Sequence, residues 1–195
     1  MKIFEDENFI KNINNILKKG AVIAFVTDTV WGVGCLPDNE KAVKKIYEIK
    51  KREAKKPLIL MSNDYENLKK YIKNPSEKMK SLVKKYFPGA LTIVSQKSDL
   101  TPKFVTSNMD TVGIRVPDNV VFQKICNIID GHVLSTTSAN VSGNTSGKSF
   151  EDVKDELGNK IDYIFEDYGY KAKGIESTVV KIENENLSVL RQGAI

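Results

Sequence analysis

The sequence AVIAFVTDTVWGVG, residues 21–34, contains the sharpest change from apolar to polar character in the chain. Its first part, 21–26, is an unbroken apolar run, which predicts a short strand buried on both faces. The rest brings two threonines, one carboxylate and two glycines into a row. Gly32 and Gly34 would let backbone N–H groups approach a ligand closely, and the alternative is a Thr/Asp turn around a core Trp31. The stretch therefore predicts a buried strand that opens into a polar loop.

Helical and strand-like patterns continue along the rest of the chain. Apolar spacing and capping residues predict helices at 6–19, 64–72, 76–86, 118–129 and 149–157, and a further helix that begins after Asp38 or Asn39 and ends at about Ile49. Short apolar runs predict strands at 57–61, 90–96, 111–116, 132–137, 161–165, 177–182 and 187–191. Strands and helices mix without strict alternation, and no linker or repeat divides them. We therefore expect one mixed α/β (α+β) domain over residues 1–195 rather than a regular doubly wound sheet.

The composition excludes several classes of protein. The 195 residues are 41% hydrophobic and 28% charged, which is typical of globular chains and excludes fibrous or disordered ones. Cys35 and Cys126 lack a CxxC spacing, which excludes a disulfide scaffold and a zinc ribbon. His132 is the only histidine, so we predict no protein-bound metal and no Ser-His-Asp or Cys-His catalysis. No signal-peptide pattern and no run of about 18 apolar residues occurs, so we expect a soluble, cytoplasmic protein without membrane contact.

The choice of basic residues is uneven. The 30 basic and 25 acidic residues give a net charge of +5, and only three of the basic residues are arginines. A compositional bias toward lysine accounts for the lysines. Arginine differs because its planar guanidinium forms bidentate contacts that an ammonium cannot form. Arg52, Arg115 and Arg191 each lie beside other unusual residues.

Two of these arginines lie at predicted strands. The segment KKREAKKP, 50–57, holds five cations directly before a strand, where they can face a phosphate or a carboxylate; a solvated charged surface is the alternative. In TVGIRVP, 111–117, strand alternation places Thr111, Gly113 and Arg115 on one face. An arginine that faces a cavity needs an anionic partner, because an unpaired buried charge is costly. That partner is either a bound ligand or an acidic side chain of the protein in an internal salt bridge.

Two further segments are polar where the chain could have stayed apolar. Small hydroxyl and amide side chains fill LSTTSANVSG, 134–143, directly after a predicted strand. They offer hydrogen bonds to phosphate or ribose without added charge, although Ser/Thr-rich connectors are also common. Near the end of the chain, Glu176 and Arg191 either pair with each other or border the same cavity.

The residues alone predict a basic, hydroxyl-lined cavity for an anionic small molecule. No phosphate-binding loop of the GxxxxGK[ST] or GxGxxG type is present. A basic groove for nucleic acid is the second interpretation, because the pI is about 9.0. Against that groove, the net charge of +5 is modest and the lysines are spread along the chain.

Seven motifs occur in order along nearly the whole chain. They are TDTVWGVG at 27–34, KKR at 50–52 with KPL at 56–58, FPGALT at 87–92, VGIRVP at 112–117, STTSANVSG at 135–143, ESTVV at 176–180 and LRQGA at 190–194. Together they resemble the YrdC/Sua5 family of L-threonylcarbamoyladenylate synthases, in its short, single-domain form. The resemblance implies a twisted mixed β-sheet flanked by helices, with a basic concave cavity.

The resemblance also implies an activity. Such an enzyme is an ATP-dependent nucleotidyltransferase that converts L-threonine, bicarbonate and ATP into threonylcarbamoyl-AMP and pyrophosphate, with Mg²⁺ carried by the ATP. The product serves the N6-threonylcarbamoylation of tRNA adenosine 37 by a separate threonylcarbamoyl transferase complex. The alternatives are a YciO-like paralogue with another acceptor, or a module for double-stranded RNA or ribosome assembly. Weak binding of tRNA or double-stranded RNA is a further expectation.

The resemblance assigns candidate residues position by position. Catalytic contacts to the ATP phosphates fall to Lys50, Arg52 and Lys56. The residues expected to border the nucleotide also include Thr111, Ser138, Asn140, Ser146 and Arg191. Those expected to border the threonine are Thr29, Arg115, Thr136 and Ser177, with Arg115 facing the carboxylate. The threonine carbamate would itself attack the α-phosphate, so no general base is needed.

Overall fold

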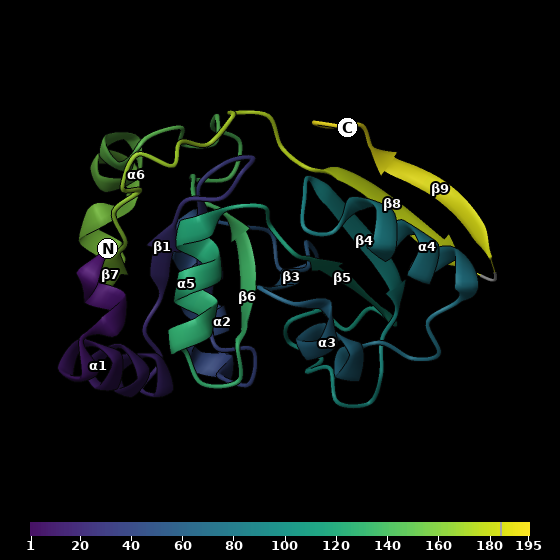
Figure 1. Cartoon of the computed structure of the whole chain (residues 1–195), viewed down its shortest axis with the longest axis horizontal. Helices are drawn as coiled ribbons and strands as arrows, with labels where there is room; N and C mark the ends of the chain where they lie inside the picture. Colours follow the sequence, from purple (N-terminus) through teal and green to yellow (C-terminus); the bar gives the residue numbers. More distant parts are fainter. Residues whose placement is uncertain (184) are drawn as a thin grey trace.

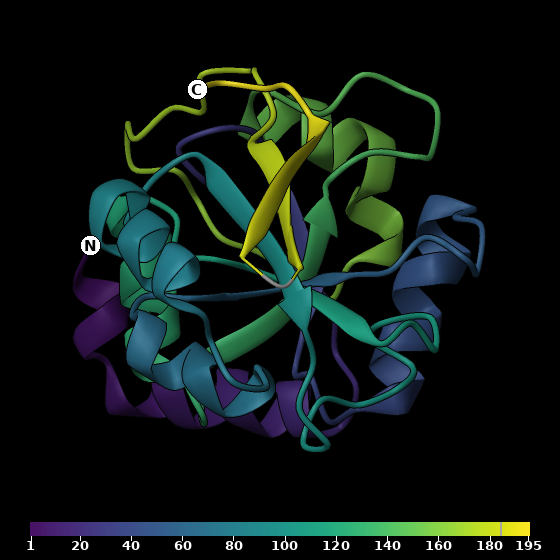
Figure 2. The same cartoon turned by 90° about the vertical axis from the view of Figure 1, so that its right-hand side faces the viewer.

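A twisted mixed sheet runs through the molecule from one end to the other (Figure 1, Figure 2). The computed structural model describes residues 1–183 and 185–195. Within these residues nine strands have the order β7-β1-β2-β6-β3-β5-β4-β8-β9. Their bounds are β1 Ile23–Phe25, β2 Gly32–Cys35, β3 Ile59–Ser62, β4 Leu91–Gln96, β5 Thr111–Arg115, β6 Val133–Ser138, β7 Tyr163–Ile164, β8 Thr178–Glu183 and β9 Asn186–Arg191. The pairs β1–β7, β3–β5 and β4–β8 are parallel and the other neighbours are antiparallel, so the expected mixed α/β fold is confirmed.

Six α-helices flank the sheet in the described part of the chain. Their bounds are α1 Glu7–Lys18, α2 Glu40–Lys50, α3 Tyr65–Leu68, α4 Glu77–Tyr86, α5 Val120–Ile128 and α6 Phe150–Leu157, with short 3-10 helices η1 Lys2–Glu5, η2 Lys69–Tyr71 and η3 Gly158–Lys160. Asn39, Ser76 and Ser149 accept hydrogen bonds from first-turn N–H groups, which begins α2, α4 and α6 where capping chemistry predicted. None of these described helices is both long and apolar enough to cross a membrane.

One predicted helix is shorter than expected. The range 64–72 contains only the single turn of α3 and then η2. Ile72 is already extended and pairs with Lys97 near the end of β4. Pro75 follows soon after and disfavours helix at Asn74, which has a φ of 46°. The local apolar spacing was therefore overridden by a pairing with a distant strand.

Strand β2 lies where a polar loop was predicted, with close approach to a ligand or a Thr/Asp turn as its alternatives. Gly32 and Gly34 lie within this strand, between β1 and β6. A Cβ on Gly32 would lie 2.8 Å from the ring of Phe25, and one on Gly34 would lie 3.1 Å from Thr136. These glycines are required because neighbouring strands bring large side chains against their backbone.

The apolar core covers β1 along its whole length. Ile23, Ala24 and Phe25 are fully buried, as the unbroken apolar run predicted. Helix α5 crosses in front of β1 and β6 (Figure 1), and its Phe122 ring lies 5.1 Å from the Phe25 ring. The loop that follows β1 is therefore held at a fixed place by a rigid strand.

Candidate active site

A cavity of about 240 Å³ is lined by residues of β2, β3, β4, β5, β6, β8 and β9 and of the loops beside them. All three arginines of the chain, Arg52, Arg115 and Arg191, line it, although they lie far apart in the sequence. The lining residues with hydroxyl groups are Thr27, Thr29, Thr92, Thr136, Thr137, Ser138 and Ser177. A single acidic residue, Glu176, stands among the lining residues that the structure describes. The basic, hydroxyl-lined cavity predicted from the residues is therefore present.

Strand register explains why two of the arginines converge. Arg115 at the end of β5 pairs with Met61 of β3. Val179 of β8 pairs with both Thr92 of β4 and Arg191 of β9. All five residues face the cavity, because alternate residues of a strand point to opposite sides of the sheet. The strand alternation predicted for Arg115 is consistent with this placement.

Arg115 is almost fully buried and already has an anionic partner. Its side chain is 3% exposed and donates to Asp28 Oδ1 at 2.5 Å, to Thr29 Oγ1 at 2.7 Å and, through Nε, to the Gly89 carbonyl at 3.0 Å. Burial lowers the pKa of Arg115 and raises that of Asp28, and the charge of each partner opposes the shift of the other. A guanidinium has five N–H groups, so two have no partner among the described residues. The internal salt bridge and a role toward a ligand are therefore compatible.

Hydroxyl groups surround Arg115 in the cavity. The Oγ1 atoms of Thr27 and Thr29 lie 3.1 Å apart, and Thr27 Oγ1 also donates to the Val30 carbonyl at 2.6 Å. On the other side, the hydroxyls of Thr92 and Ser177 lie 2.8 Å apart. These short bonds fix the orientation of the hydroxyls, so the cavity presents a preset pattern of donors and acceptors.

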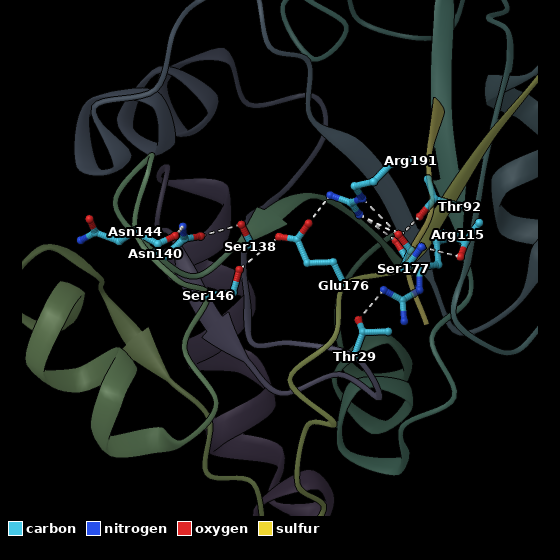
Figure 3. Close-up of polar contacts among 12 residues, drawn as sticks. Thr29, Thr92, Arg115, Ser138, Asn140, Asn144, Ser146, Glu176, Ser177 and Arg191 are labelled. Carbon is cyan, nitrogen blue, oxygen red and sulfur yellow. Dashed lines mark hydrogen bonds and ion pairs between the residues drawn. The ribbon is translucent and has the colours of Figure 1, made fainter. Parts of the chain in front are cut away.

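Glu176 joins Arg191 of the cavity wall to Ser146, which lies outside the lining (Figure 3). One carboxylate oxygen pairs with Arg191 Nη1, and the other accepts a hydrogen bond from Ser146 Oγ at 3.1 Å. Arg191 also donates to the Ser177 carbonyl at 2.8 Å. Both alternatives left open by the sequence therefore occur together, because Glu176 and Arg191 pair and also line the same cavity.

Arg52 is half-buried at the entrance to β3. Its Nε donates to the Lys56 carbonyl and its Nη2 to the Pro57 carbonyl, each at 3.0 Å. Burial lowers the pKa of this guanidinium. Its remaining N–H groups have no partner among the described residues, so this cation is available to an anion in the cavity.

Lys50 lies beneath the loop after β6 and does not line the cavity. It is 1% exposed, and its ammonium group donates to the carbonyls of Ser138 and Asn140 at 2.5 Å and to Asn140 Oδ1 at 3.2 Å. These contacts use all three donors of the ammonium. Burial lowers the pKa of Lys50 to about 8. Lys50, for which contact with phosphate stays a prediction, thus holds the end of β6 at Ser138 and the loop that follows it.

The predicted site residues divide into two groups. Those that line the cavity are Thr29, Arg52, Arg115, Thr136, Ser138, Ser177 and Arg191. Those outside the lining are Lys50, Lys56, Thr111, Asn140 and Ser146. Lys56 is exposed and pairs with Glu53 at 2.7 Å, and Thr111 lies at the opposite end of β5 from Arg115. Asn140 holds its own loop by donating to the Asn144 carbonyl at 2.7 Å.

Thr92 is a lining residue that the sequence analysis did not select. It lies in β4 within the run ALTIV, where a hydroxyl interrupts apolar residues and is 1% exposed. A polar residue inside a buried strand requires a partner, here Ser177. That interruption is the signal by which the residue could have been found.

Among the described lining residues, Glu176 is the one carboxylate that could contact a metal ion bound to a phosphate ligand. Among the described residues, no group of three or more His, Cys, Asp or Glu side chains is placed to hold a metal ion. Glu176 is the lining residue with the right chemistry, because Mg²⁺ is commonly bound by one or two carboxylates together with substrate phosphates.

Comparison with known proteins places the chain in a family. The Sua5/YciO/YrdC family model, described as "Telomere recombination", matches residues 15–193. A putative threonylcarbamoyl-AMP synthase of Methanocaldococcus jannaschii is 34% identical over 200 residues, which cover 100% of this chain and 93% of that protein. The crystal structure of P. abyssi Sua5 complexed with L-threonine has a TM-score of 0.88 at 33% identity and covers 96% of this chain. The crystal structure of E. coli YciO has a TM-score of 0.84 at 25% identity, with 96% of this chain and 90% of that one covered.

The relatives differ in length. The match covers 55% of the P. abyssi Sua5 chain, so this chain spans about half of that protein. It spans nearly all of the M. jannaschii relative. Because the family match extends over almost every residue, from 15 to 193, the chain belongs to the Sua5/YciO/YrdC family.

Proposed function

We propose that this protein is a threonylcarbamoyl-AMP synthase, an ATP-dependent nucleotidyltransferase that uses L-threonine, bicarbonate and ATP. The observation that carries the proposal is the convergence of all three arginines on one hydroxyl-lined cavity. The identity of 34% over the whole chain to a putative threonylcarbamoyl-AMP synthase supports this activity. The likeness to Sua5 complexed with L-threonine supports threonine as the amino-acid substrate.

Threonine binds at the Arg115 end of the cavity. The two N–H groups of Arg115 without a described partner receive the carboxylate, while Asp28 and Gly89 hold the guanidinium in place. The Thr29 and Ser177 hydroxyls border the amino acid, and Thr136 lies on the same wall. Because the guanidinium is already fixed, carboxylate binding needs little reorganisation.

The nucleotide enters from the opposite end. The cavity of about 240 Å³ is smaller than the roughly 300–1,000 Å³ of common ligand pockets, so we place threonine and the reacting phosphates inside it and the adenosine at its opening. Arg52 and Arg191 neutralise the phosphates, and the adenosine extends outward along the loop that carries Ser138. The Mg²⁺ carried by ATP would supply further charge neutralisation, and Glu176 is the lining carboxylate that would hold it. Lys50 acts by holding this loop.

The reaction requires positioning and charge neutralisation rather than a protein base. The threonine amine adds to the carbon supplied by bicarbonate, and water leaves as the carbamate forms. A carbamate oxygen then attacks the α-phosphorus of ATP, and the bond to the pyrophosphate group breaks. The arginines stabilise the charge that develops on the phosphate oxygens. The product passes to a separate threonylcarbamoyl transferase complex that modifies tRNA in the cytoplasm.

The activity is tested by pyrophosphate release from ATP with bicarbonate and Mg²⁺. We expect release that depends on L-threonine and is at least tenfold slower with L-serine. Omission of bicarbonate should abolish it. Tight ATP binding without threonine-dependent release would instead favour a YciO-like paralogue with another acceptor, and would overturn the proposal.

A further inference from the structure

Two pairs of hydroxyl groups line the cavity, and a count of their protons distinguishes them. One pair is Thr27 with Thr29, and the other is Thr92 with Ser177. A hydroxyl group has one proton to donate, and its oxygen can accept two hydrogen bonds. A buried hydroxyl proton without an acceptor is destabilising, so the contacts around each pair decide which oxygen donates.

The pair of Thr27 and Thr29 has an acceptor for each of its protons. Thr27 Oγ1 donates to the Val30 carbonyl at 2.6 Å, which uses its proton. The Thr29 hydroxyl therefore donates to Thr27 Oγ1, 3.1 Å away, and its oxygen accepts from Arg115 Nη1 at 2.7 Å. This pair offers no proton to a ligand, and its contacts hold the guanidinium of Arg115.

The pair of Thr92 and Ser177 has one proton left over. Thr92 is 1% exposed, and Ser177 Oγ, 2.8 Å away, is the partner of its hydroxyl among the described residues. If Ser177 donated to Thr92, the Thr92 proton would be buried without an acceptor. Thr92 therefore donates, and Ser177 Oγ accepts from Thr92 and from Arg191 Nη2 at 3.3 Å. Both acceptor positions of Ser177 are then filled, and its own proton has no acceptor in the described part of the chain.

This remaining proton lies where the other cavity groups are also donors. The register of β4 and β5, continued by one residue, sets Thr92 beside Arg115. Figure 3 shows the Ser177 contacts with Thr92 and with Arg191, whose guanidinium donates to the Ser177 carbonyl at 2.8 Å. A ligand group that fits between two guanidinium groups and a hydroxyl donor must accept from all of them. An ionised carboxylate is such a group, because it only accepts hydrogen bonds.

We propose that Thr92 is a positioning residue that fixes Ser177 as a hydrogen-bond donor to the carboxylate of L-threonine. The identity of this ligand rests on the proposed function, whereas the direction of the bond between Thr92 and Ser177 does not. Thr92 holds the Ser177 oxygen before the ligand arrives, so the Ser177 proton needs little reordering on binding. An amino acid in the reverse orientation would bring its ammonium group, which has only donors, against this proton. Thr92 thus also sets the orientation of the substrate.

The first experiment measures L-threonine affinity by calorimetry. Thr92→Val keeps the shape of the side chain but removes the donor, so threonine should bind about fivefold more weakly, the usual effect of one neutral hydrogen bond. Thr92→Ser restores the hydroxyl and should bind within about twofold of the wild type. Thr101→Val is the matched control, because Thr101 is 3% exposed, donates to the Tyr71 carbonyl at 2.7 Å and lies outside the lining. Its threonine affinity should equal that of the wild type.

A double-mutant cycle separates positioning from a general loss of structure. If Thr92 acts through Ser177, the change Thr92→Val has no further effect once Ser177 is altered. The variant Thr92→Val/Ser177→Ala should therefore bind threonine within about twofold of Ser177→Ala. Neutron diffraction from deuterated crystals of the ligand-free wild type tests the direction of the bond separately. We expect the deuterium between the two oxygens to be bonded to Thr92 Oγ1, and that of Ser177 to point into the cavity.

Four outcomes would overturn the inference. They are equal threonine affinities of Thr92→Val and Thr101→Val, no recovery in Thr92→Ser, effects that multiply in the double variant, and a deuterium between the oxygens that is bonded to Ser177. Failure of the proposed function gives a different result. A wild type that binds threonine but releases no pyrophosphate from ATP would count against the synthase and leave the role of Thr92 intact. Threonine-dependent release together with unchanged affinity in Thr92→Val would do the reverse.

Discussion

At the scale of single residues, the site depends on how buried cations are satisfied. Arg115 is neutralised by Asp28 and has two N–H groups without a partner among the described residues. Lys50 has no ion pair with a described carboxylate, and its ammonium group donates to oxygens of Ser138 and Asn140. Most of the N–H groups of Arg52 have no partner in the part of the chain that the structure describes. The same formal charge is therefore placed in three different ways: paired with a carboxylate in the cavity, buried against carbonyl oxygens, and facing the cavity without an anionic partner among the described residues.

Replacement of Arg115 should remove threonine binding while leaving ATP binding largely intact. Arg115→Ala also leaves Asp28 buried without its partner, which costs about 3–5 kcal/mol of unfolding free energy. The double variant Arg115→Ala/Asp28→Asn removes that unpaired charge, so it should recover stability but not threonine affinity. Calorimetry of both variants tests the assignment. Threonine affinity equal to that of the wild type in the double variant would rule out Arg115 as the carboxylate ligand.

Lys50 should leave a signature in the pH dependence of stability. Its folded-state pKa of about 8 lies below the ordinary value of 10.5, so between these values the unfolded chain binds more protons. Its contribution to the unfolding free energy is therefore least favourable below pH 8 and becomes more favourable as pH rises toward 10.5. Relative to Lys50→Met, the wild type should gain stability across this window by at most about 1.4 kcal/mol per pH unit. The unfolding free energies of the two proteins are measured with urea at several pH values. If the difference between the wild type and Lys50→Met does not change with pH, this prediction is wrong.

At the scale of elements, the tail after β9 fixes the start of β8. The Thr178 hydroxyl accepts hydrogen bonds from the N–H groups of Gly193 at 3.0 Å and Ile195 at 3.3 Å, and the Ala194 N–H donates to the Glu176 carbonyl at 2.9 Å. Two cavity residues, Glu176 and Ser177, therefore owe their place to the last residues of the chain.

Gly193→Ala should disturb the cavity from outside it. A Cβ at this position would lie 2.3 Å from the Glu176 carbonyl oxygen and 2.5 Å from the Ser177 carbonyl carbon, so the backbone of these residues must shift. We expect threonine affinity to fall at least tenfold. Gly158→Ala is the matched control, because its nearest neighbour would be a flexible lysine side chain at 3.4 Å. Equal threonine titration curves for the two variants would mean that the tail does not position the site.

At the scale of the whole molecule, the cavity joins distant parts of the sheet. Its lining extends along the strand order from β2, through β6, β3, β5, β4 and β8, to β9. A ligand in the cavity therefore contacts elements that pair with each other only through intervening strands.

Ligand binding should consequently stabilise the entire fold. A ligand at 100 times its dissociation constant adds about 2.7 kcal/mol to the unfolding free energy. Thermal unfolding should show separate increases in Tm with L-threonine and with MgATP. Arg52→Ala should lose the increase with MgATP and keep the increase with threonine. If this variant keeps both increases, the phosphates bind elsewhere.

The secondary structure was predictable where local chemistry is strong. Caps at Ser76 and Ser149 and the apolar run of β1 determine their elements without help from distant residues. Strand β2 was not predictable, because two of its four residues are glycines with low strand propensity. Its pairing partners β1 and β6 lie on either side of it, and β6 is separated from it by about 100 residues of chain.

The sequence by itself determined the chemistry of the site: three arginines among many lysines, hydroxyls at strand ends, and motifs in order along the chain. These features are encoded in residue identity, so no coordinates are needed to find them. Only the tertiary structure decided the roles. Arg115 lines the cavity while Lys50 does not, because strand register and burial determine which donors are already occupied. Strand register and burial depend on contacts between residues far apart in the sequence, and local sequence patterns do not specify those contacts.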